Sequence, residues 1–311
     1  MDYRNVGASG LRVSAVGLGC NNFGVRLDES GTRAVVHAAL DAGITLFDTS
    51  DSYGGRGGSE IFLGKALAQR RADVVVATKF ASPMDEAGRL QGGSRRYIMQ
   101  AAEASLKRLG TDWIDLYQFH RPDPLTPMEE SLRALDDLVR QGKVRYVGLS
   151  NHPAWQVVDA IWISRLRNYS SLVSCQDEYS LLSRGAEREL LPMLAKMRLG
   201  LLPYFPLAGG MLSGKYKQGE EMPSGSRLSQ GGAIAGRVTR PEVWRKTEAL
   251  RAFAQSHGRS LLELAFSWLA ANPIVSSVIA GATSPAQIRA NVEAVSWALG
   301  PQELAEIGRL A

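Results

Sequence analysis

Eight short apolar segments alternate with longer segments of helical periodicity along this chain, and that alternation constrains its fold more than any other feature. Each apolar segment ends at a polar or glycine residue, which is typical of a buried parallel strand. The expected strands are Ser14–Leu18, Thr45–Phe47, Val74–Thr78, Leu116–Phe119, Val144–Gly148, Leu172–Cys175, Leu201–Tyr204 and Ser277–Ile279. Eight βα units in 311 residues predict an α/β fold of the (β/α)8 barrel type. A doubly wound sheet is the alternative, because strand order cannot be read from a sequence.

The segments between and before these strands complete the expected architecture. Helices are expected to begin near Glu29, Ser59, Ser94, Pro127, Pro153, Ala186, Pro241 and Ser284. Tyr3–Val6 and Leu11–Val13 predict a β-hairpin that precedes the first barrel strand. Residues 209–236 follow the seventh strand, are rich in Gly and Ser, and predict a long loop of the kind that usually has a function. No low-complexity linker divides the chain, so we expect one domain over residues 1–311.

Composition excludes several classes of protein. The net charge of +5 comes from scattered residues, which suits a phosphorylated small-molecule ligand and predicts no nucleic-acid surface. The longest apolar stretch, Leu261–Ala282, contains charged and helix-breaking residues, so we expect no membrane span. The two cysteines, Cys20 and Cys175, form no CxxC motif, and the first residues show no export signal; both features predict a cytoplasmic protein. None of the four histidines is paired as HxH or HExxH, so no metal site is expected.

Two glycine-rich segments approach nucleotide-binding motifs without matching them. Gly17–Asn22 begins like GxGxxG but has Asn22 in place of the third glycine, which tight packing around a dinucleotide needs. Gly209–Lys215 fits GxxxxGK, but Tyr216 replaces the Ser or Thr that would hold magnesium. Neither a Rossmann fold nor a P-loop ATPase is therefore expected.

Six polar side chains follow five of the apolar segments, at the places where a barrel builds its functional site. They are Asp48, Tyr53, Lys79, His120, Asn151 and Gln176. Each alone has an ordinary structural explanation, such as a helix cap or a solvated charge. Together, a carboxylate, a phenol, an amine and an imidazole form an acid–base set. A phenol keeps its proton at neutral pH, a nearby ammonium lowers its pKa, and a carboxylate keeps that ammonium charged.

Several longer segments resemble the aldo/keto reductases, in the order and with the spacing of that family. They are Phe47–Gly55 continuing to Gly58–Glu60, Thr111–Arg121, Leu138–Asn151, Tyr204–Tyr216 and Gly281–Pro285. The resemblance covers nearly the whole chain. It implies a (β/α)8 barrel that binds a nicotinamide dinucleotide without a Rossmann fold and reduces an aldehyde or ketone to the alcohol.

The resemblance also implies a role for each member of the acid–base set. Tyr53 would protonate the carbonyl oxygen as the hydride arrives, and Lys79 would lower the pKa of Tyr53. Asp48 would anchor Lys79, while His120 would orient and polarise the substrate carbonyl.

Cofactor-binding residues are implied by position in the same way. Ser150, Asn151 and Gln176 would hydrogen-bond the carboxamide, and Tyr204 would stack on the nicotinamide ring. The pyrophosphate would be enclosed by Leu207, Gly209, Lys215 and Arg227, and the adenosine end by Gly281, Thr283, Gln287 and Asn291. Further implied contacts are Gly19, Cys20, Asn21, Asp48, Phe205, Pro206 and Ala208.

The choice of cofactor is less sharply implied. Many NADPH-specific relatives have a Lys near position 281 and an Arg at position 287, whereas this chain has Gly281 and Gln287. Ala290 also stands where a Glu commonly precedes the Asn. NADPH is nevertheless expected, with the hydroxyl of Thr283 as a substitute contact, and NADH stays possible.

Substrate and partners are the least determined. A small-molecule carbonyl compound is expected, either polar or aromatic, and the oligomeric state is left open. One alternative is a cofactor-sensing regulatory subunit like the potassium-channel β-subunits of this fold, which lack the histidine found here as His120. Another alternative is a barrel lyase or isomerase without redox chemistry.

Overall fold

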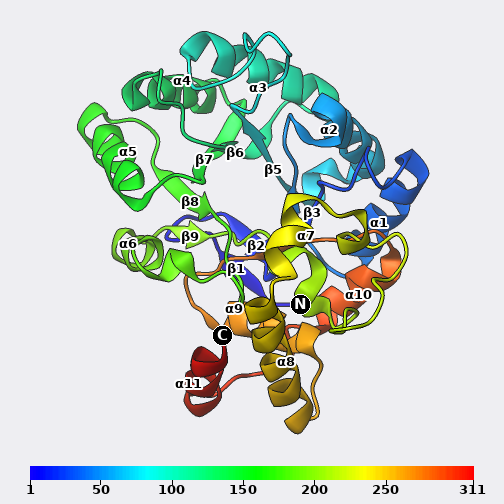
Figure 1. Ribbon diagram of the computed structural model, residues 1–311. Helices are drawn as coiled ribbons and strands as arrows, with labels where there is room; N and C mark the ends of the chain where they lie inside the picture. Colours follow the sequence, from blue (N-terminus) through cyan, green and yellow to red (C-terminus); the bar gives the residue numbers. More distant parts are fainter.

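Eight parallel strands form the centre of the fold, in the order β10-β3-β4-β5-β6-β7-β8-β9 (Figure 1). The computed structural model describes residues 1–311. The strands are β3 (Val16–Gly19), β4 (Leu46–Asp48), β5 (Val75–Phe80), β6 (Ile114–Phe119), β7 (Val144–Ser150), β8 (Leu172–Gln176), β9 (Gly200–Leu201) and β10 (Val278–Gly281). The Leu201 amide donates to Ile274 O at 2.8 Å and the Ser276 amide donates to Leu201 O at 2.9 Å, which closes the sheet. The expected (β/α)8 barrel is confirmed, and the doubly wound alternative is wrong.

Helices surround this barrel (Figure 1). They are α1 (Glu29–Asp41), α2 (Tyr53–Leu67), α3 (Arg95–Leu109), α4 (Met128–Arg140), α5 (Ala154–Arg167), α6 (Leu190–Met197), α7 (Gly232–Val238), α8 (Pro241–Ser256), α9 (Leu261–Ala271), α10 (Pro285–Glu293) and α11 (Pro301–Leu310). Capping side chains mark where several of them begin. Asp28, Ser94 and Ser260 each accept a hydrogen bond from a backbone amide in the first turn of a helix. None of these helices has the length and apolar character that crossing a membrane requires.

The amino-terminal hairpin closes one end of the barrel. Strands β1 (Tyr3–Asn5) and β2 (Arg12–Ser14) are antiparallel, as the sequence predicts. Val6, Leu11 and Val13 are buried in a small apolar cluster with side chains from inside the barrel. These partners are Leu46, Ala77, Leu116, Val173, Leu202 and Ile279. Because this end is filled by apolar packing, the opposite end, where the strands have their carboxyl termini, is left for polar groups.

Several expected boundaries differ from the observed ones. The seventh strand was expected at Leu201–Tyr204, but β9 ends at Leu201 and Tyr204 forms only an isolated bridge, to Glu178. The helix expected from Ala186 begins as the short 3-10 turn η2 (Gly185–Glu187), with regular α6 starting four residues later. Helices α7, α9 and α11 were not predicted. Helix α9 is apolar on nearly all sides, so its sequence shows little helical periodicity.

The long segment after β9 is less irregular than its composition suggests. It contains the 3-10 turns η3 (Ala208–Ser213) and η4 (Leu228–Gln230) and the start of α7. Tyr216 and Leu228 are buried in the main apolar cluster, which fixes the segment to the barrel. It lies beside the carboxyl ends of the strands and so forms one wall of the site described next.

Candidate active site

The register of the parallel strands brings the predicted polar residues to one level of the barrel. Asp48 pairs with Gly19 of β3, and Ser150 of β7 pairs with Gln176 of β8. Lys79 of β5 pairs with Gln118 of β6, two residues before His120. The carboxyl ends of parallel strands meet at one face, so residues that are far apart in sequence become neighbours there.

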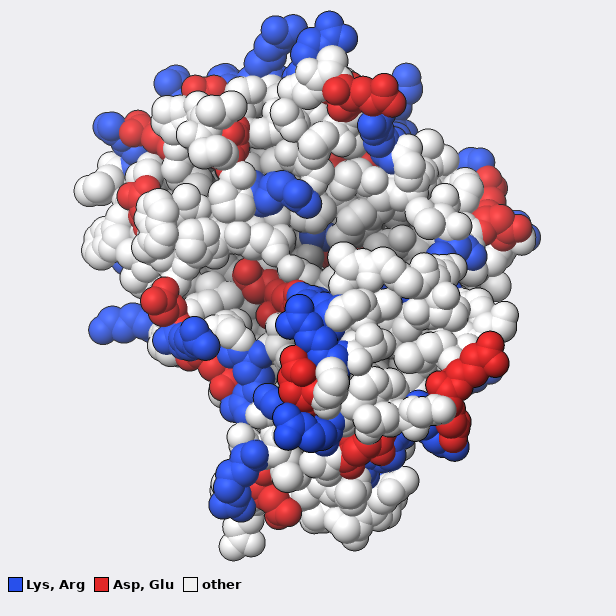
Figure 2. All heavy atoms as spheres, in the orientation of Figure 1, with Lys and Arg blue, Asp and Glu red and all other residues white.

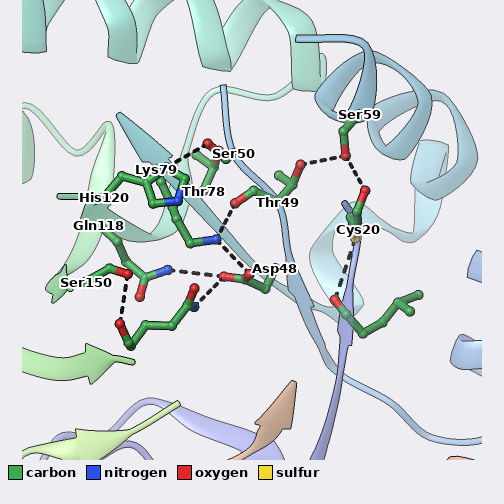
Figure 3. A network of polar contacts seen from close by, with 12 residues as sticks. Cys20, Asp48, Thr49, Ser50, Ser59, Thr78, Lys79, Gln118, His120 and Ser150 are labelled. Atoms are coloured by element: carbon green, nitrogen blue, oxygen red, sulfur yellow. Dashed lines mark hydrogen bonds and ion pairs between the residues drawn. The ribbon is translucent and has the colours of Figure 1, made fainter. Parts of the chain in front are cut away.

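A buried ion pair forms the floor of the site (Figure 3). The Nζ of Lys79 donates to Oδ2 of Asp48 at 2.7 Å and to the backbone oxygen of Thr49 at 2.8 Å. Lys79 has no exposed surface and Asp48 is 3% exposed. Burial lowers the pKa of Lys79, but the Asp48 carboxylate, together with Tyr53 and Cys20, outweighs this effect and raises that pKa above its ordinary value. The ammonium therefore stays charged at neutral pH.

Two glutamines hold the second oxygen of Asp48. Gln118 Nε2 donates to Oδ1 at 3.2 Å, and Gln176 Nε2 donates to the same atom at 2.8 Å. The carboxylate is thus fixed on three sides by donors, which is what a buried charge requires. Gln118 was not among the predicted site residues, because it lies inside an expected strand rather than after one.

Tyr53 lies above the ion pair, directly after the loop that follows β4. The Nζ of Lys79 is 5.1 Å from the centroid of the Tyr53 ring, and the His120 ring centroid is 5.9 Å away. Burial raises the pKa of Tyr53 above its ordinary value, while the Lys79 charge acts in the opposite direction. The predicted effect of the ammonium is therefore present, but burial is the larger effect. The phenol keeps its proton at neutral pH.

His120 is an uncharged imidazole at the wall of the site. Burial, together with the charges of Lys79 and Arg121, lowers the pKa of His120 to about 2. Its Nδ1 lies 3.2 Å from the Oγ atoms of both Ser50 and Ser82. The ring is 8% exposed, and Figure 3 shows it on the same side of the barrel as Lys79 and Asp48.

A run of glycines lets the chain turn sharply after Tyr53. Gly54, Gly55 and Gly57 have φ values of 69°, 73° and 113°, which side chains rarely adopt. At Gly54 an added Cβ would also lie 2.7 Å from the backbone oxygen of Phe23. The regular part of α2 follows this turn, so the glycines position Tyr53 between the barrel and the helix.

A cleft of about 1030 Å³ extends from this acid–base set along the carboxyl ends of the strands. Figure 2 shows the hollow near the middle of that face, with Lys and Arg side chains at its margin. The cleft is lined by the predicted residues Gly19, Asn21, Asp48, Tyr53, His120, Ser150, Asn151, Gln176, Tyr204, Phe205, Pro206, Leu207, Gly209, Lys215, Arg227, Gly281, Thr283, Gln287 and Asn291. Three predicted residues do not line it: Lys79 and Cys20, which have no exposed surface, and Ala208, which is 3% exposed.

The predicted carboxamide contacts are already hydrogen-bonded within the protein. Asn151 donates through Nδ2 to His120 O at 2.9 Å, and its Oδ1 accepts from the Tyr204 hydroxyl at 2.7 Å. The Ser150 hydroxyl donates to the backbone oxygen of Gln176 at 2.8 Å. These bonds orient the side chains, and a ligand amide at this position would compete with the Tyr204–Asn151 bond.

Arginines connect the long segment after β9 to the opposite wall of the cleft. Arg227 Nη2 donates to Asn22 Oδ1 at 3.2 Å, and Arg26 donates to the backbone oxygen of Gly225. Lys215 lines the cleft together with these two arginines, so three cations face it from this segment and the opposite wall. Asn22 was not among the predicted contacts; the signal that could have found it is an amide side chain in the loop after the first strand.

The far end of the cleft is neutral at its surface. Gln287 Oε1 accepts from the Thr283 amide at 2.8 Å and lies 3.3 Å from the Thr283 hydroxyl. Ser284 caps α10, as the Ser-Pro pair predicts. A Cβ at Gly281 would lie 3.1 Å from Asn22 Nδ2, so a larger residue there would crowd the loop after β3.

Fold and cleft together define a class of protein: a (β/α)8 barrel whose strand ends hold an acid–base set beside a long cation-lined cleft. The family model of the aldo/keto reductases matches residues 15–311. The chain therefore belongs to the aldo/keto reductase family, and it is an oxidoreductase of a family that reduces carbonyl groups with a nicotinamide cofactor.

Curated relatives cover nearly the full chain. A probable voltage-gated potassium channel subunit beta of Oryza sativa subsp. japonica is 39% identical over 95% of this chain and 91% of its own length. An uncharacterized oxidoreductase of Bacillus subtilis is 38% identical over 98% of this chain and 94% of its own length. The L-glyceraldehyde 3-phosphate reductase of Escherichia coli K12 is 35% identical over 99% of this chain and 91% of its own length.

Proposed function

We propose that the protein reduces an aldehyde or ketone to the alcohol with NADPH, and that Tyr53 provides the proton. The observation that carries this proposal is the Lys79–Asp48 pair, buried directly beneath Tyr53 at the end of the cleft. A buried ammonium and carboxylate are costly to maintain, and perturbed groups of this kind concentrate at functional sites.

The residues of the cleft fit a nicotinamide dinucleotide. Lys215 and Arg227 present cations where a pyrophosphate would lie, and Tyr204 offers an aromatic ring near His120. When bound, the reduced cofactor supplies the hydride. We propose NADPH rather than NADH as the cofactor, with the hydroxyl of Thr283, which lines the cleft, as a contact at the adenosine end.

The chain's own residues supply proton transfer and carbonyl polarisation. Tyr53 keeps its proton at neutral pH and faces the cleft, so it can donate to the carbonyl oxygen. Lys79 offsets the negative charge that develops on the phenol oxygen as the proton leaves. His120 is neutral and offers a ring N–H to the same carbonyl oxygen without adding a charge.

The relatives support a small polar substrate. The Escherichia coli relative is named for an aldehyde with a phosphate group. In this chain Arg121 is exposed, lines the cleft next to His120 and forms no ion pair, so it is available to an anionic group of a substrate. Both cysteines are free and buried, which fits a reducing compartment such as the cytoplasm.

A cofactor-sensing subunit is the second candidate function. It is favoured by the 39% and 38% identity to probable potassium channel β-subunits of two plants. His120 completes the acid–base set in this chain and favours turnover. A redox-dependent effect on a partner protein, without steady-state turnover, would support the sensing function instead.

Binding and turnover can be tested in sequence. Purified protein is titrated with NADPH and with NADH by fluorescence, and a panel of aldehydes and ketones, including phosphorylated ones, is then followed by oxidation of the cofactor. Tight binding of NADPH with turnover of a carbonyl compound is expected. Absence of binding by either nucleotide would overturn the proposal, and binding without turnover would favour the sensing function.

A further inference from the structure

The two ring nitrogens of His120 have different surroundings. Nδ1 faces the hydroxyls of Ser50 and Ser82, each at 3.2 Å, whereas Nε2 forms no hydrogen bond with the protein. A neutral imidazole carries one proton, on one nitrogen or the other. His120 can donate to a carbonyl oxygen in the cleft through Nε2 only when Nδ1 is unprotonated and accepts a hydrogen bond from a serine.

Ser50 has one proton and several possible acceptors. Its Oγ lies 3.1 Å from Asp51 Oδ1, 3.0 Å from Ser52 Oγ and 3.2 Å from His120 Nδ1. A carboxylate is the strongest acceptor of the three. When Asp51 is ionised, the Ser50 hydroxyl donates its hydrogen bond to Asp51 and can only accept a hydrogen bond from Nδ1. This favours the form of His120 that is protonated on Nδ1. When Asp51 is protonated, it donates to Ser50, and Ser50 donates to Nδ1.

Ser82 does not decide the outcome by itself. Its hydroxyl has no partner other than His120 Nδ1, so it can donate to this nitrogen or accept from it. The direction of the whole hydrogen-bond chain is therefore left to the group at its other end, which is Asp51.

Asp51 is placed so that both of its protonation states are accessible. The residue is 1% exposed, and its Oδ2 accepts from the Tyr97 hydroxyl at 3.3 Å. The charged groups that face it are Glu60 and Arg108, which bond each other at 2.6 Å, and the phenol of Tyr117 also lies near. Burial first, and then the charge of Glu60, raise the pKa of Asp51 to about 7.

We propose that Asp51, acting through Ser50, selects which ring nitrogen of His120 carries the proton. Asp51 is then a positioning residue that acts through His120. It makes the polarisation of the substrate carbonyl by His120 dependent on pH. At low pH the proton of His120 is on Nε2, so the ring can donate to a carbonyl oxygen in the cleft. At high pH the proton is on Nδ1, so Nε2 has no proton to donate. The catalytic consequence rests on the proposed reductase function, but the tautomer itself does not.

Nitrogen-15 NMR of the imidazole side chains tests this inference directly, because the two tautomers give distinct nitrogen shifts. The chain has four histidines, and His120→Gln assigns the signal of interest. Wild-type protein without cofactor is expected to change from Nε2–H to Nδ1–H as pH rises through about 7. Asp51→Asn, which mimics the protonated acid, is expected to hold the Nε2–H form throughout. Ser50→Ala, which cuts the connection between Asp51 and His120, is expected to show no tautomer change near pH 7.

Asp177→Asn is the matched control. Burial raises the pKa of Asp177 to about 8, but this carboxyl does not contact His120 or its serines. The tautomer change should persist in this variant. A single tautomer in wild-type protein at all pH values, or an unchanged transition in Asp51→Asn, would overturn the inference.

The pH profile of turnover gives a second, independent readout. In wild-type enzyme kcat is expected to fall about tenfold per pH unit once Asp51 is ionised. Asp51→Asn should keep kcat flat over the same range. A tautomer change without any turnover would leave the inference intact and count against the reductase function. Turnover without a tautomer change would support the reductase function and overturn the inference.

Discussion

The Lys79–Asp48 pair makes a strong prediction about stability. In Asp48→Asn the remaining carbonyl oxygen can still accept from Gln118 and Gln176, which directs the new NH2 group toward the Lys79 ammonium. Donor then faces donor, and Thr49 O is the one acceptor left for a fully buried cation. The variant should therefore be strongly destabilised at neutral pH.

The size of this effect follows from the geometry of the pair. Two unit charges 2.7 Å apart attract by about 6 kcal/mol at an effective dielectric constant of about 20. Removing one partner of a buried pair typically costs about 3–5 kcal/mol of folding free energy, because the other charge is left unpaired. We expect a loss in that range for Asp48→Asn.

The loss should depend on pH and on Lys79. Without Asp48 the pKa of Lys79 falls, so the unfolded chain binds more protons than the folded one and stability rises with pH. Adding Lys79→Met removes the unpaired charge and should restore at least about 2 kcal/mol. Urea denaturation of the two variants and wild type, at neutral and alkaline pH, measures these differences. A loss below about 1 kcal/mol, or no recovery in the double variant, would refute the reasoning.

Three further predictions concern packing, titration and reactivity. Gly64→Ala places a Cβ 2.7 Å from the backbone carbon of Leu109 and should cost about 1–3 kcal/mol, whereas Gly308→Ala meets nothing within 4 Å and should be neutral or stabilising in the same denaturation assay. The folded-state pKa of Asp51 lies above its ordinary value, so wild-type stability should fall by up to about 4 kcal/mol from about pH 4 to about pH 7, and Asp51→Asn should flatten that fall. Burial raises the pKa of both cysteine thiols well above the ordinary value, so mass spectrometry should detect alkylation only after unfolding; rapid alkylation of native protein would contradict their burial.

Much of the architecture could be predicted because its signals are local. Apolar strands that end at polar residues, and helix caps such as Ser94, are encoded in a few consecutive residues. Helix α9 lacks such a signal: it packs on nearly all sides, so its sequence shows little periodicity. Strand β9 ends at Leu201, although the amides of Leu202 and Tyr204 still donate to Cys175 O and Asp177 O; Pro203, which has no amide hydrogen to donate, lies between them.

Which polar residues gather at the candidate site could be predicted from the sequence, but the balance of forces among them could not. The positions of Asp48, Lys79 and His120 after or at the ends of strands place them in the site. The net direction of the Tyr53 pKa was not predictable, because it depends on burial, which only the folded chain defines. Likewise, the Ser50–Asp51 connection to His120 joins residues that are about 70 positions apart.

Substitution of Tyr53 by Phe tests the central claim most directly. The change removes only the hydroxyl that we propose as the proton donor. Turnover of a carbonyl substrate should fall by about 10²–10⁴-fold, while NADPH binding stays close to that of wild type. Unchanged turnover in Tyr53→Phe would contradict the account.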